Sequence, residues 1–325
     1  MRVLCFTNMY PEPQRPVFGI FIKEEHDALL RIFPELIIDR VQLSGGGLFR
    51  KYFTKSFWFL KKIVERRPDI IHVHFGLTFV SLWLVIPYAK LRKIPVLYTS
   101  HGGDLIGASQ IVRFISRSAL RICDAAIFVS RETARLAPQS LHLKQHIPCG
   151  VNPEIFYPCR KLYHSLIKNN EYVIVFPSSP NRVEKNFARF CSIVESVKKQ
   201  LPAHKIVVRL IDGLDRKDVA LLLSSAVCVL MTSHYEGSPQ VVKEAVFCGC
   251  PVISVDVGDV KDVVSGVHGC QVTDLDSELA QACITLITNG IDADSFSITS
   301  EKIVKDYKID NVAKRILDVY NKMLG

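Results

Sequence analysis

The chain has 325 residues, 48% of them hydrophobic and 22% charged, which is typical of an ordinary globular protein with about two domains. A membrane-spanning class is excluded, because no run of about 20 apolar residues occurs. The formal net charge of +9 favours an anionic partner. Charge alone does not choose between a nucleotide, a nucleic acid and an acidic membrane.

The first ten residues, MRVLCFTNMY, lack the apolar run of a secretion signal, because Thr7 and Asn8 interrupt it. The 10 cysteines include no CxxC pair, and Cys248-Gly249-Cys250 has the wrong spacing for a zinc knuckle. We therefore expect a cytoplasmic protein with buried, reduced thiols.

Short β-branched runs alternate with helical patterns along the chain, which is typical of parallel sheets wound by crossover helices. Strands are predicted at 2–8, 35–43, 69–75, 94–100 and 125–130, and then at 171–177, 205–211, 226–232 and 250–256. A final helical pattern covers 301–324. The predicted fold class is α/β, with two facing doubly wound, Rossmann-like domains.

The stretch PCGVNPEIFYPCRK, at 148–161, has three prolines and little periodicity, so we interpret it as the connection between the domains. The predicted domains are 1–158 and 159–325, with the last helix packing back on the N-terminal domain. Two such domains bind ligands in a cleft outside the carboxyl ends of their strands.

A helix start in HYEGSPQVVKEAV is suited to an anion. A predicted strand leads into it, Ser238 is the expected N-cap, and Pro239 stands at the first helical position. The backbone N–H groups of Gln240 and Val241 then have no partner inside the helix and lie at the positive end of its dipole. Gly237 allows a ligand close to the backbone. These features predict a phosphate site.

Two glutamates flank this helix start. Glu236 precedes the helix, and Glu244 lies at the edge of the buried face that Val241, Val242, Ala245 and Val246 form on a helical wheel. Two carboxylates would repel a phosphate unless they accept hydrogen bonds from hydroxyl groups, which indicates a ligand with a diphosphate and sugar hydroxyls. The alternative is that Glu236 is a plain loop residue and Glu244 a solvated helix residue.

The segment EGSPQVVKEA, followed by GCPVISVDVGDVKDVV, resembles the donor-site signature of the retaining GT-B glycosyltransferases of family four. The segments PDIIHVHF, LYTSHGGD, CDAAIFVS, CGVNPEIFYP and VEKN occur in the order, and at roughly the separations, of that family. The resemblance implies a GT-B fold, a nucleotide-diphosphate sugar as donor and a glycan or lipid-linked acceptor in surface polysaccharide or cell-envelope synthesis. It implies no metal, no further cofactor and no nucleic-acid partner.

The resemblance also implies roles for single residues. Glu244 would bind the ribose hydroxyls and Glu236 the hydroxyls of the donor sugar, while the segment from Gly237 to Val241 would meet the sugar and diphosphate. Lys185 matches a lysine that contacts the phosphates. The family's arginine five or six residues earlier is missing, so Arg182 either substitutes for it or is a solvated loop residue.

In the first half, the resemblance places His101 against the donor sugar as a catalytic residue beside Lys185 and Glu236. The alternative is a histidine packed under the glycine turn. Asp104 either contacts the acceptor or caps the next helix. Gly19 matches one of the two glycines of a loop that packs against the phosphates. Two further histidines, His72 and His74, alternate along a predicted strand, so we expect at least one to be structural.

The aspartate pairs at 274–276 and 292–294 fit the pattern of metal-using transferases, but we interpret them as caps or turns because they lie in polar stretches beyond the donor signature. Two other functions stay open: a non-catalytic binding or scaffold protein of the same fold, and a GT-B nucleotide-sugar epimerase. Transfer, mere binding or a free epimeric product would distinguish the three.

A basic run at 50–67, RKYFTKSFWFLKKIVERR, forms an amphipathic helical pattern. Its apolar face, expected to pack on the sheet, comprises Tyr52, Phe53, Phe57, Phe59, Leu60, Ile63 and Val64, and its basic face Lys51, Lys55, Lys61, Lys62 and Arg66. Trp58 falls on the basic face. The pattern predicts either a solvated helix or peripheral binding to an anionic membrane at its inner face.

Overall fold

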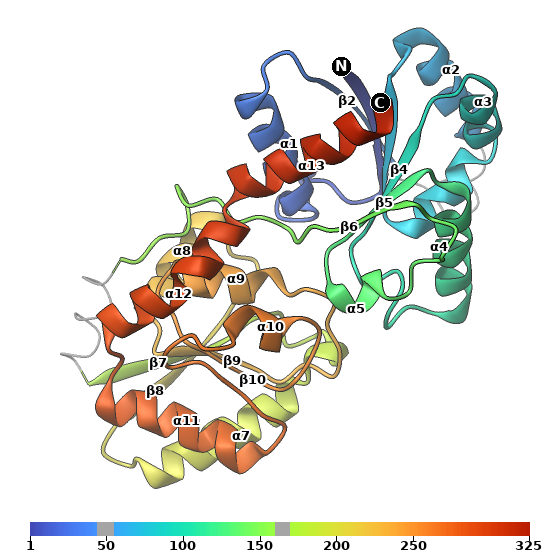
Figure 1. Ribbon diagram of the computed structural model, residues 1–325. Helices are drawn as coiled ribbons and strands as arrows, with labels where there is room; N and C mark the ends of the chain where they lie inside the picture. Colours follow the sequence, from blue (N-terminus) through green and yellow to red (C-terminus); the bar gives the residue numbers. More distant parts are fainter. Residues whose placement is uncertain (44–54, 160–169) are drawn as a thin grey trace. The chain divides into compact units, whose positions relative to one another are not determined.

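The computed structural model describes residues 1–43, 55–159 and 170–325, and these form two compact units. Unit 1 comprises Met1–Gly150 and Ile309–Gly325, and unit 2 comprises Val151–Lys308. Each unit is an α/β domain built on one parallel sheet (Figure 1).

Unit 1 has a six-stranded sheet in the order β2-β1-β3-β4-β5-β6. The strands are β1 (Arg2–Thr7), β2 (Ile37–Gln42), β3 (Ile70–His74), β4 (Val96–Ser100), β5 (Ala125–Phe128) and β6 (Leu143–His146). The helices are α1 (Ile20–Ile32), α2 (Ser56–Arg66), η2 (Gly76–Leu82), α3 (Val85–Leu91), α4 (Gln110–Ile122), α5 (Arg131–Ala134) and α13 (Ile309–Leu324). β3 and β4 are buried throughout, as expected for central strands covered on both faces.

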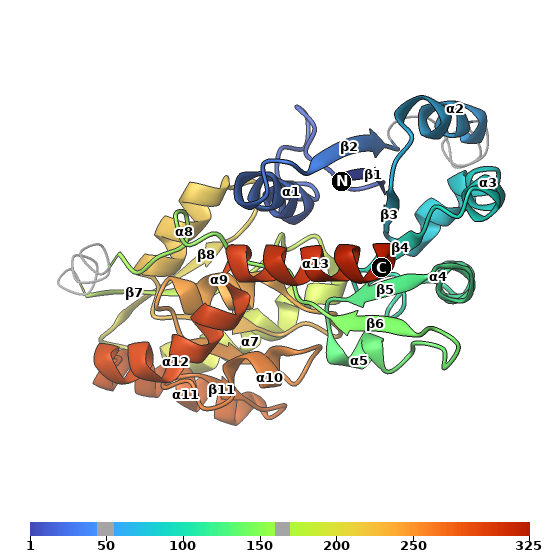
Figure 2. The same ribbon diagram turned by 45° about the horizontal axis from the view of Figure 1, so that its top comes forward.

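Two helical layers cover this sheet. On one face, Phe6 and Val73 pack in a core that also includes Phe59 of α2 and Leu120 of α4. On the other face, the core includes residues of α1 and α13, and these two helices lie side by side (Figure 2). The amphipathic pattern of α13 explains this, because its buried residues recur at helical spacing.

Unit 2 has a five-stranded sheet in the order β11-β10-β9-β7-β8. The strands are β7 (Glu171–Phe176), β8 (Lys205–Leu210), β9 (Cys228–Met231), β10 (Val252–Ser254) and β11 (Gln271–Val272). The helices are η3 (Val183–Lys185), α7 (Phe187–Gln200), α8 (Arg216–Ser225), α9 (Gln240–Phe247), α10 (Val260–Val264), α11 (Asp276–Asn289) and α12 (Ala293–Tyr307). Residues of α7 and α11 line one core, and residues of α8, α9, α10 and α12 line the other.

The chain divides at Gly150, earlier than the predicted boundary at 158. Phe156 explains the difference, because its side chain is 1% exposed and lies in the core of unit 2. The predicted helical pattern over 301–324 is also two helices, which separate at Lys308. There Val151 pairs with Lys308 in a β-bridge, and its backbone N–H donates to the Tyr307 carbonyl at 2.8 Å.

Helix α2 corrects the predicted helical wheel. Phe59 and Ile63 are buried as expected, but Phe57 and Val64 are 70% and 50% exposed, so they do not pack on the sheet. The apolar face was predicted to be wider than it is. The buried residues of this short surface helix are only Ser56, Phe59 and Ile63. The part of the predicted run from 50 to 54, with Lys51, Tyr52 and Phe53, lies outside the described residues.

Candidate functional site

The polar side chains of unit 2 gather beyond the carboxyl ends of its strands. Lys185 follows β7, Arg216 follows β8, Glu236 follows β9 and Asp259 follows β10. These four strands are neighbours in one parallel sheet, so their carboxyl ends meet at one edge. Ligands of doubly wound sheets bind at this edge.

Lys185 and Glu236, predicted separately as catalytic residues, form an ion pair with Nζ and Oε1 2.5 Å apart. Their side chains are only 8% and 12% exposed. The hydroxyl of Ser233 also donates to Glu236 Oε1, at 2.6 Å. The carboxylate is therefore a fixed acceptor rather than a mobile loop group.

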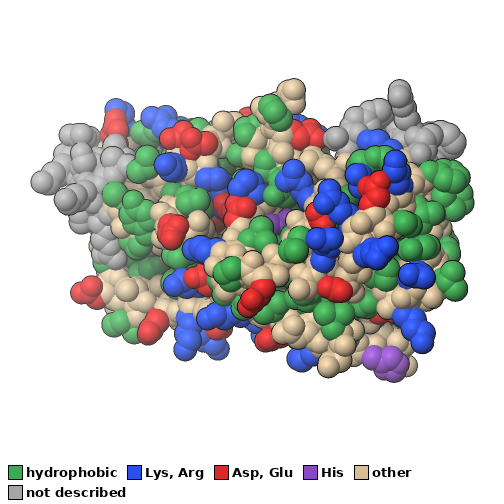
Figure 3. Space-filling model, turned by 90° about the horizontal axis from the view of Figure 1, so that it is seen from above, with side chains coloured by type: hydrophobic (Ala, Val, Ile, Leu, Met, Phe, Trp, Pro, Cys, Tyr) green, Lys and Arg blue, Asp and Glu red, His purple; other side chains and the backbone are tan. Residues whose placement is uncertain are grey.

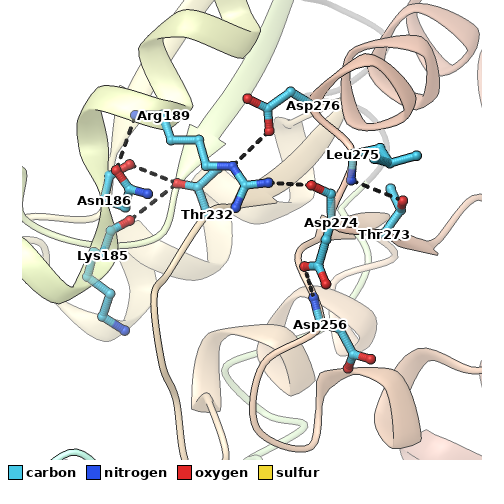
Figure 4. Close-up of polar contacts among 9 residues, drawn as sticks. All are labelled: Lys185, Asn186, Arg189, Thr232, Asp256, Thr273, Asp274, Leu275 and Asp276. Carbon is cyan, nitrogen blue, oxygen red and sulfur yellow. Dashed lines mark hydrogen bonds and ion pairs between the residues drawn. The ribbon is translucent and has the colours of Figure 1, made fainter.

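The backbone around Lys185 is held from β9, as Figure 4 shows. Thr232 Oγ1 lies 3.2 Å from the Lys185 carbonyl and 3.1 Å from that of Asn186. Asn186 has a left-handed backbone (φ 54°) and caps α7 by accepting a hydrogen bond from the Arg189 backbone N–H. These contacts fix the C-terminal end of the turn that carries the Lys185 ammonium.

The predicted cap and turn roles hold for Asp274 and Asp292 but not for Asp276, because the N-cap of α11 is Leu275. Arg189 donates to the Asp276 carboxylate at 2.8 Å and to the Asp274 carbonyl at 2.6 Å (Figure 4). Asp274 also accepts from the backbone N–H of Asp256. In the second pair, Asp292 caps α12.

Glu244 is 3% exposed on α9, which excludes a solvated helix residue. Its Oε1 accepts a hydrogen bond from Arg216 Nη1 at 2.6 Å. The Arg216 guanidinium also lies 4.5 Å from the ring centroid of Phe156. The sequence analysis did not identify Arg216. Its position after the carboxyl end of β8 could have indicated a site residue, because ligands of such sheets bind at this edge.

The predicted N-cap of α9 is wrong. The helix starts at Gln240 with Pro239 as N-cap, and Pro239 makes no side-chain cap bond. Ser238 Oγ instead donates to Asp259 Oδ2 at 2.5 Å and accepts from Lys243 Nζ at 2.6 Å. Lys243 is fully buried, so Ser238 serves this buried charge network rather than the helix amides.

The glycine loop before α9 is fixed by close backbone contact. Gly258 has φ +57°, and a Cβ there would lie 2.6 Å from the carbonyl oxygen of Gly237. No side chain fits between these two loops. The first turn of α9 lies at the positive end of the helix dipole, so this helix start retains the geometry of an anion site.

Arg182 lies apart from this arrangement. Its side chain is 55% exposed and pairs with Glu184 at 2.6 Å. The structure therefore does not bring it to the pair of Lys185 and Glu236.

In unit 1, His101 follows β4 and contacts a second histidine. Its Nε2 lies 3.0 Å from Nδ1 of His74, and the two rings are nearly parallel. The ring of Phe21 lies 4.9 Å from that of His101. Burial lowers the pKa of His101 to about 4, so the imidazole is neutral near pH 7. Its Nδ1 is buried and has no hydrogen-bond partner among the described residues.

Asp104 is fully buried and organises the turn after His101. Its carboxylate accepts hydrogen bonds from the Gly76 backbone N–H at 2.9 Å, from the Ser100 hydroxyl at 2.7 Å and from the Tyr98 hydroxyl. It does not cap the next helix, whose N-cap is Ser109. With no exposed surface, it supports the turn from inside the domain.

Gly19 is the N-cap of α1 and has φ +68°. A Cβ there would lie 2.5 Å from the backbone carbon of Met9, so only glycine lets these two segments meet. Both predicted strand histidines are buried. His72 is satisfied by Tyr320 and Thr99, as a structural residue would be, whereas His74 contacts His101.

Comparison with known proteins agrees with this architecture. The family described as Glycosyltransferase Family 4 matches residues 4–155, and Glycosyl transferases group 1 matches residues 192–289. A curated relative, N-acetyl-alpha-D-glucosaminyl L-malate synthase of Bacillus anthracis, is 21% identical over 91% of this chain and 86% of its own.

Solved structures share the whole fold. Sucrose-phosphate synthase from Thermosynechococcus elongatus has a TM-score of 0.71 at 16% identity, covering 99% of this chain and 98% of that chain. HepE of Anabaena in complex with UDP-glucose has a TM-score of 0.72 at 13% identity, covering 99% and 100%. The two Rossmann-like domains therefore define a GT-B protein. With both family matches in chain order, the chain belongs to the family-four GT-B glycosyltransferases.

Proposed function

We propose that this glycosyltransferase moves a sugar from a nucleotide-diphosphate sugar to a glycan or lipid-linked acceptor, with retention of anomeric configuration. The observation that carries the proposal is the buried pair of Lys185 and Glu236 in the same unit as the glycine loop and the start of α9. Solved relatives were crystallised with UDP or UDP-glucose, which supports a nucleotide-sugar donor.

The charges of unit 2 suit the two halves of such a donor. Lys185 and the first-turn amides of α9 offer fixed positive groups for the diphosphate, whose negative charge grows as it leaves. Glu236 and Glu244 are each held in place by a cation and offer carboxylate oxygens as acceptors for sugar and ribose hydroxyls. Arg216 positions the Glu244 carboxylate.

The proposed chemistry needs no protein nucleophile. The acceptor hydroxyl attacks the anomeric carbon from the face that the diphosphate leaves, and the departing diphosphate takes the hydroxyl proton. His101 binds the donor sugar as a neutral imidazole. We propose that transfer requires no added divalent metal, because Lys185 and the helix amides supply the positive charge.

A panel of nucleotide sugars tests the proposal. Thermal shift identifies the donor, since a specific ligand stabilises the native state by mass action. Transfer of labelled sugar without added Mg²⁺ or Mn²⁺ is then measured, and NMR of the product reports its anomeric configuration. Binding without turnover would show a binding protein, a free epimer would show an epimerase, and an inverted product would refute retention.

We also propose that unit 1 docks on an anionic membrane. Among the described helices, none combines the length and apolarity needed to cross a bilayer. On α2 and beside α3, the exposed rings of Phe57 and Trp83 are in edge-to-face contact, and Lys62 lies 5.5 Å from the Trp58 ring. On α4, Ile111 and Phe114 are 73% and 71% exposed.

These helices cover the same face of the sheet, and hydrophobic side chains gather beside Lys and Arg toward the right edge of Figure 3, where α2, α3 and α4 lie in Figure 1. Exposed aromatic rings among basic residues match the interface of an anionic bilayer. Such docking would bring the enzyme to a lipid-linked acceptor.

A further inference from the structure

A cluster of potential metal ligands lies inside unit 1, between the sheet and α1. It combines Cys5 of β1, His26 of α1 and His74 of β3, whose ligand atoms all lie within 4.8 Å of one another. The three residues are 0%, 4% and 0% exposed. They come from three separate elements, so only the folded unit brings them together.

Polar atoms of this cluster have no hydrogen-bond partner among the described residues. They are Nε2 of His26, Nε2 of His74 and Oε1 of the neighbouring Glu25, which is 6% exposed. Buried polar atoms in native proteins are nearly always paired, and an unpaired one calls for an explanation such as a bound ion. Three unpaired polar atoms in neighbouring side chains indicate one shared partner.

A second overlapping group contains Glu25, His72 and His74, and hydrogen bonds decide between the two. Both ring nitrogens of His72 are in use, with Nδ1 2.8 Å from the Tyr320 hydroxyl and Nε2 2.7 Å from that of Thr99. His72 therefore has no nitrogen left for a metal. Glu25 shares the second group with His74 but does not lie within 4.8 Å of both Cys5 and His26, so the first group supplies three ligands.

The ligand types favour zinc. A thiolate and two imidazoles are three of the four ligands of a tetrahedral zinc site, at about 2.0–2.3 Å from the ion. Such bonds place ligand atoms about 3.3–3.6 Å apart, so a pair at the 4.8 Å limit needs a contraction of up to about 1.5 Å. The Cys5 thiolate and the carboxylate of Glu25, which lies near His74, balance a dication and leave the buried site without net charge.

We propose that Cys5, His26 and His74 bind one zinc-class divalent cation inside unit 1, with Glu25 beside His74 balancing its charge. Nε2 of His74 binds the ion, and its Nδ1–H donates to Nε2 of His101, as metal-bound histidines commonly donate their second nitrogen. The ion is structural and separate from the donor-side charges of unit 2. Only its effect on His101 rests on the proposed function.

The test uses the full chain without a polyhistidine tag and does not depend on transfer activity. Mass spectrometry should find one zinc per chain, and Co²⁺ added to the metal-stripped protein should give a thiolate-to-cobalt absorption band at one equivalent. Cys5→Ser should abolish that band, and His26→Asn should weaken Co²⁺ binding by at least tenfold, because a lost ligand costs most of the site's affinity.

Matched controls are Cys123→Ser, which removes another buried thiol of unit 1, and His142→Asn, which removes an exposed histidine of the same unit. Both should bind Co²⁺ like the parent. Circular dichroism checks that the ligand variants fold. If they do not fold, the melting temperature of the parent protein is measured with and without Zn²⁺, and Zn²⁺ should raise it. A parent that binds neither ion, or a Cys5→Ser variant that keeps the band, would overturn the proposal.

Discussion

The two units handle buried polar groups in opposite ways. In unit 2, Glu236 and Glu244 each accept a short hydrogen bond from a cation at the carboxyl ends of the strands. In unit 1, the buried Asp104 carboxylate accepts hydrogen bonds from neutral donors, and His101 lies against His74 with the pKa values of both lowered by burial. The proposed function accounts for this difference, because ion-paired side chains in unit 2 suit an anionic donor and neutral imidazoles in unit 1 suit an uncharged sugar.

The largest expected effect comes from removing the cation of the buried pair. Lys185→Ala should lower the turnover number by about a hundred- to a thousandfold, because it removes a fixed positive group from the departing diphosphate. It should also destabilise unit 2, since Glu236 loses its partner. Steady-state transfer rates and thermal unfolding measure the two effects.

A double variant separates them. Lys185→Met with Glu236→Gln should recover stability, because neither charge is left unpaired, without recovering turnover. Lys198→Ala is the control, as this lysine is exposed and pairs with Glu195 on the surface of α7. Full activity in Lys185→Ala would remove the lysine from the mechanism.

The next largest effect is expected from the substitution of Glu244. Glu244→Gln should weaken nucleoside-diphosphate binding by about 1.5–3 kcal/mol, roughly ten- to a hundredfold in Kd, since the ribose would lose a charged acceptor. Titration calorimetry measures this, with Glu195→Gln as an exposed control on α7. An unchanged Kd would show that Glu244 serves Arg216 alone.

A smaller effect is expected from removing the neutral imidazole of His101 in unit 1. His101→Ala should lower transfer about two- to tenfold, because it removes a neutral hydrogen bond of about 0.5–1.5 kcal/mol, and should leave nucleoside-diphosphate affinity unchanged. Activity and melting temperature are measured together. If activity and melting temperature fall in proportion, His101 is a packing residue of unit 1. The proposed contrast between a charged site in unit 2 and a neutral site in unit 1 would then be wrong.

The smallest effect concerns charge that unit 1 carries on its surface. Binding to anionic liposomes should weaken with salt, and each lysine removed in Lys55→Glu/Lys62→Glu should cost about 1 kcal/mol, roughly fivefold. Trp58→Ala should weaken it further. Sedimentation with neutral and anionic vesicles measures this, and equal binding to both would exclude docking through α2.

The sequence predicted nine of the strands near their observed places, because buried parallel strands are continuous β-branched runs. It missed β6 and β11, which are short edge strands with intermediate burial and no such run. The break at Lys308 was also hidden, because helical periodicity continues on both sides and only the bridge to Val151 ends α12.

Local signatures indicated Glu236, Glu244 and Lys185 as candidate site residues, but not the ion pairs that they form. Lys185 and Arg216 follow other strands than the two glutamates and meet them only in the folded sheet. Ser238 looked like an N-cap because serine before proline usually is one. Its hydroxyl instead bonds both buried Lys243 and buried Asp259. These residues lie 5 and 21 positions further along the chain, so no local pattern shows the contact.

The return of α13 to unit 1 sets an order of events during synthesis. Ile316, Val319 and Tyr320 of α13 fill one face of the first sheet, yet they follow the 158 residues from Val151 to Lys308, counted as 308 − 151 + 1. At translation rates of about 5–20 residues per second, that face waits roughly 10–30 s for its cover. The last residue of unit 2 is therefore made before α13, and a chain that ended at Lys308 would leave this hydrophobic face of the first sheet without its α13 cover.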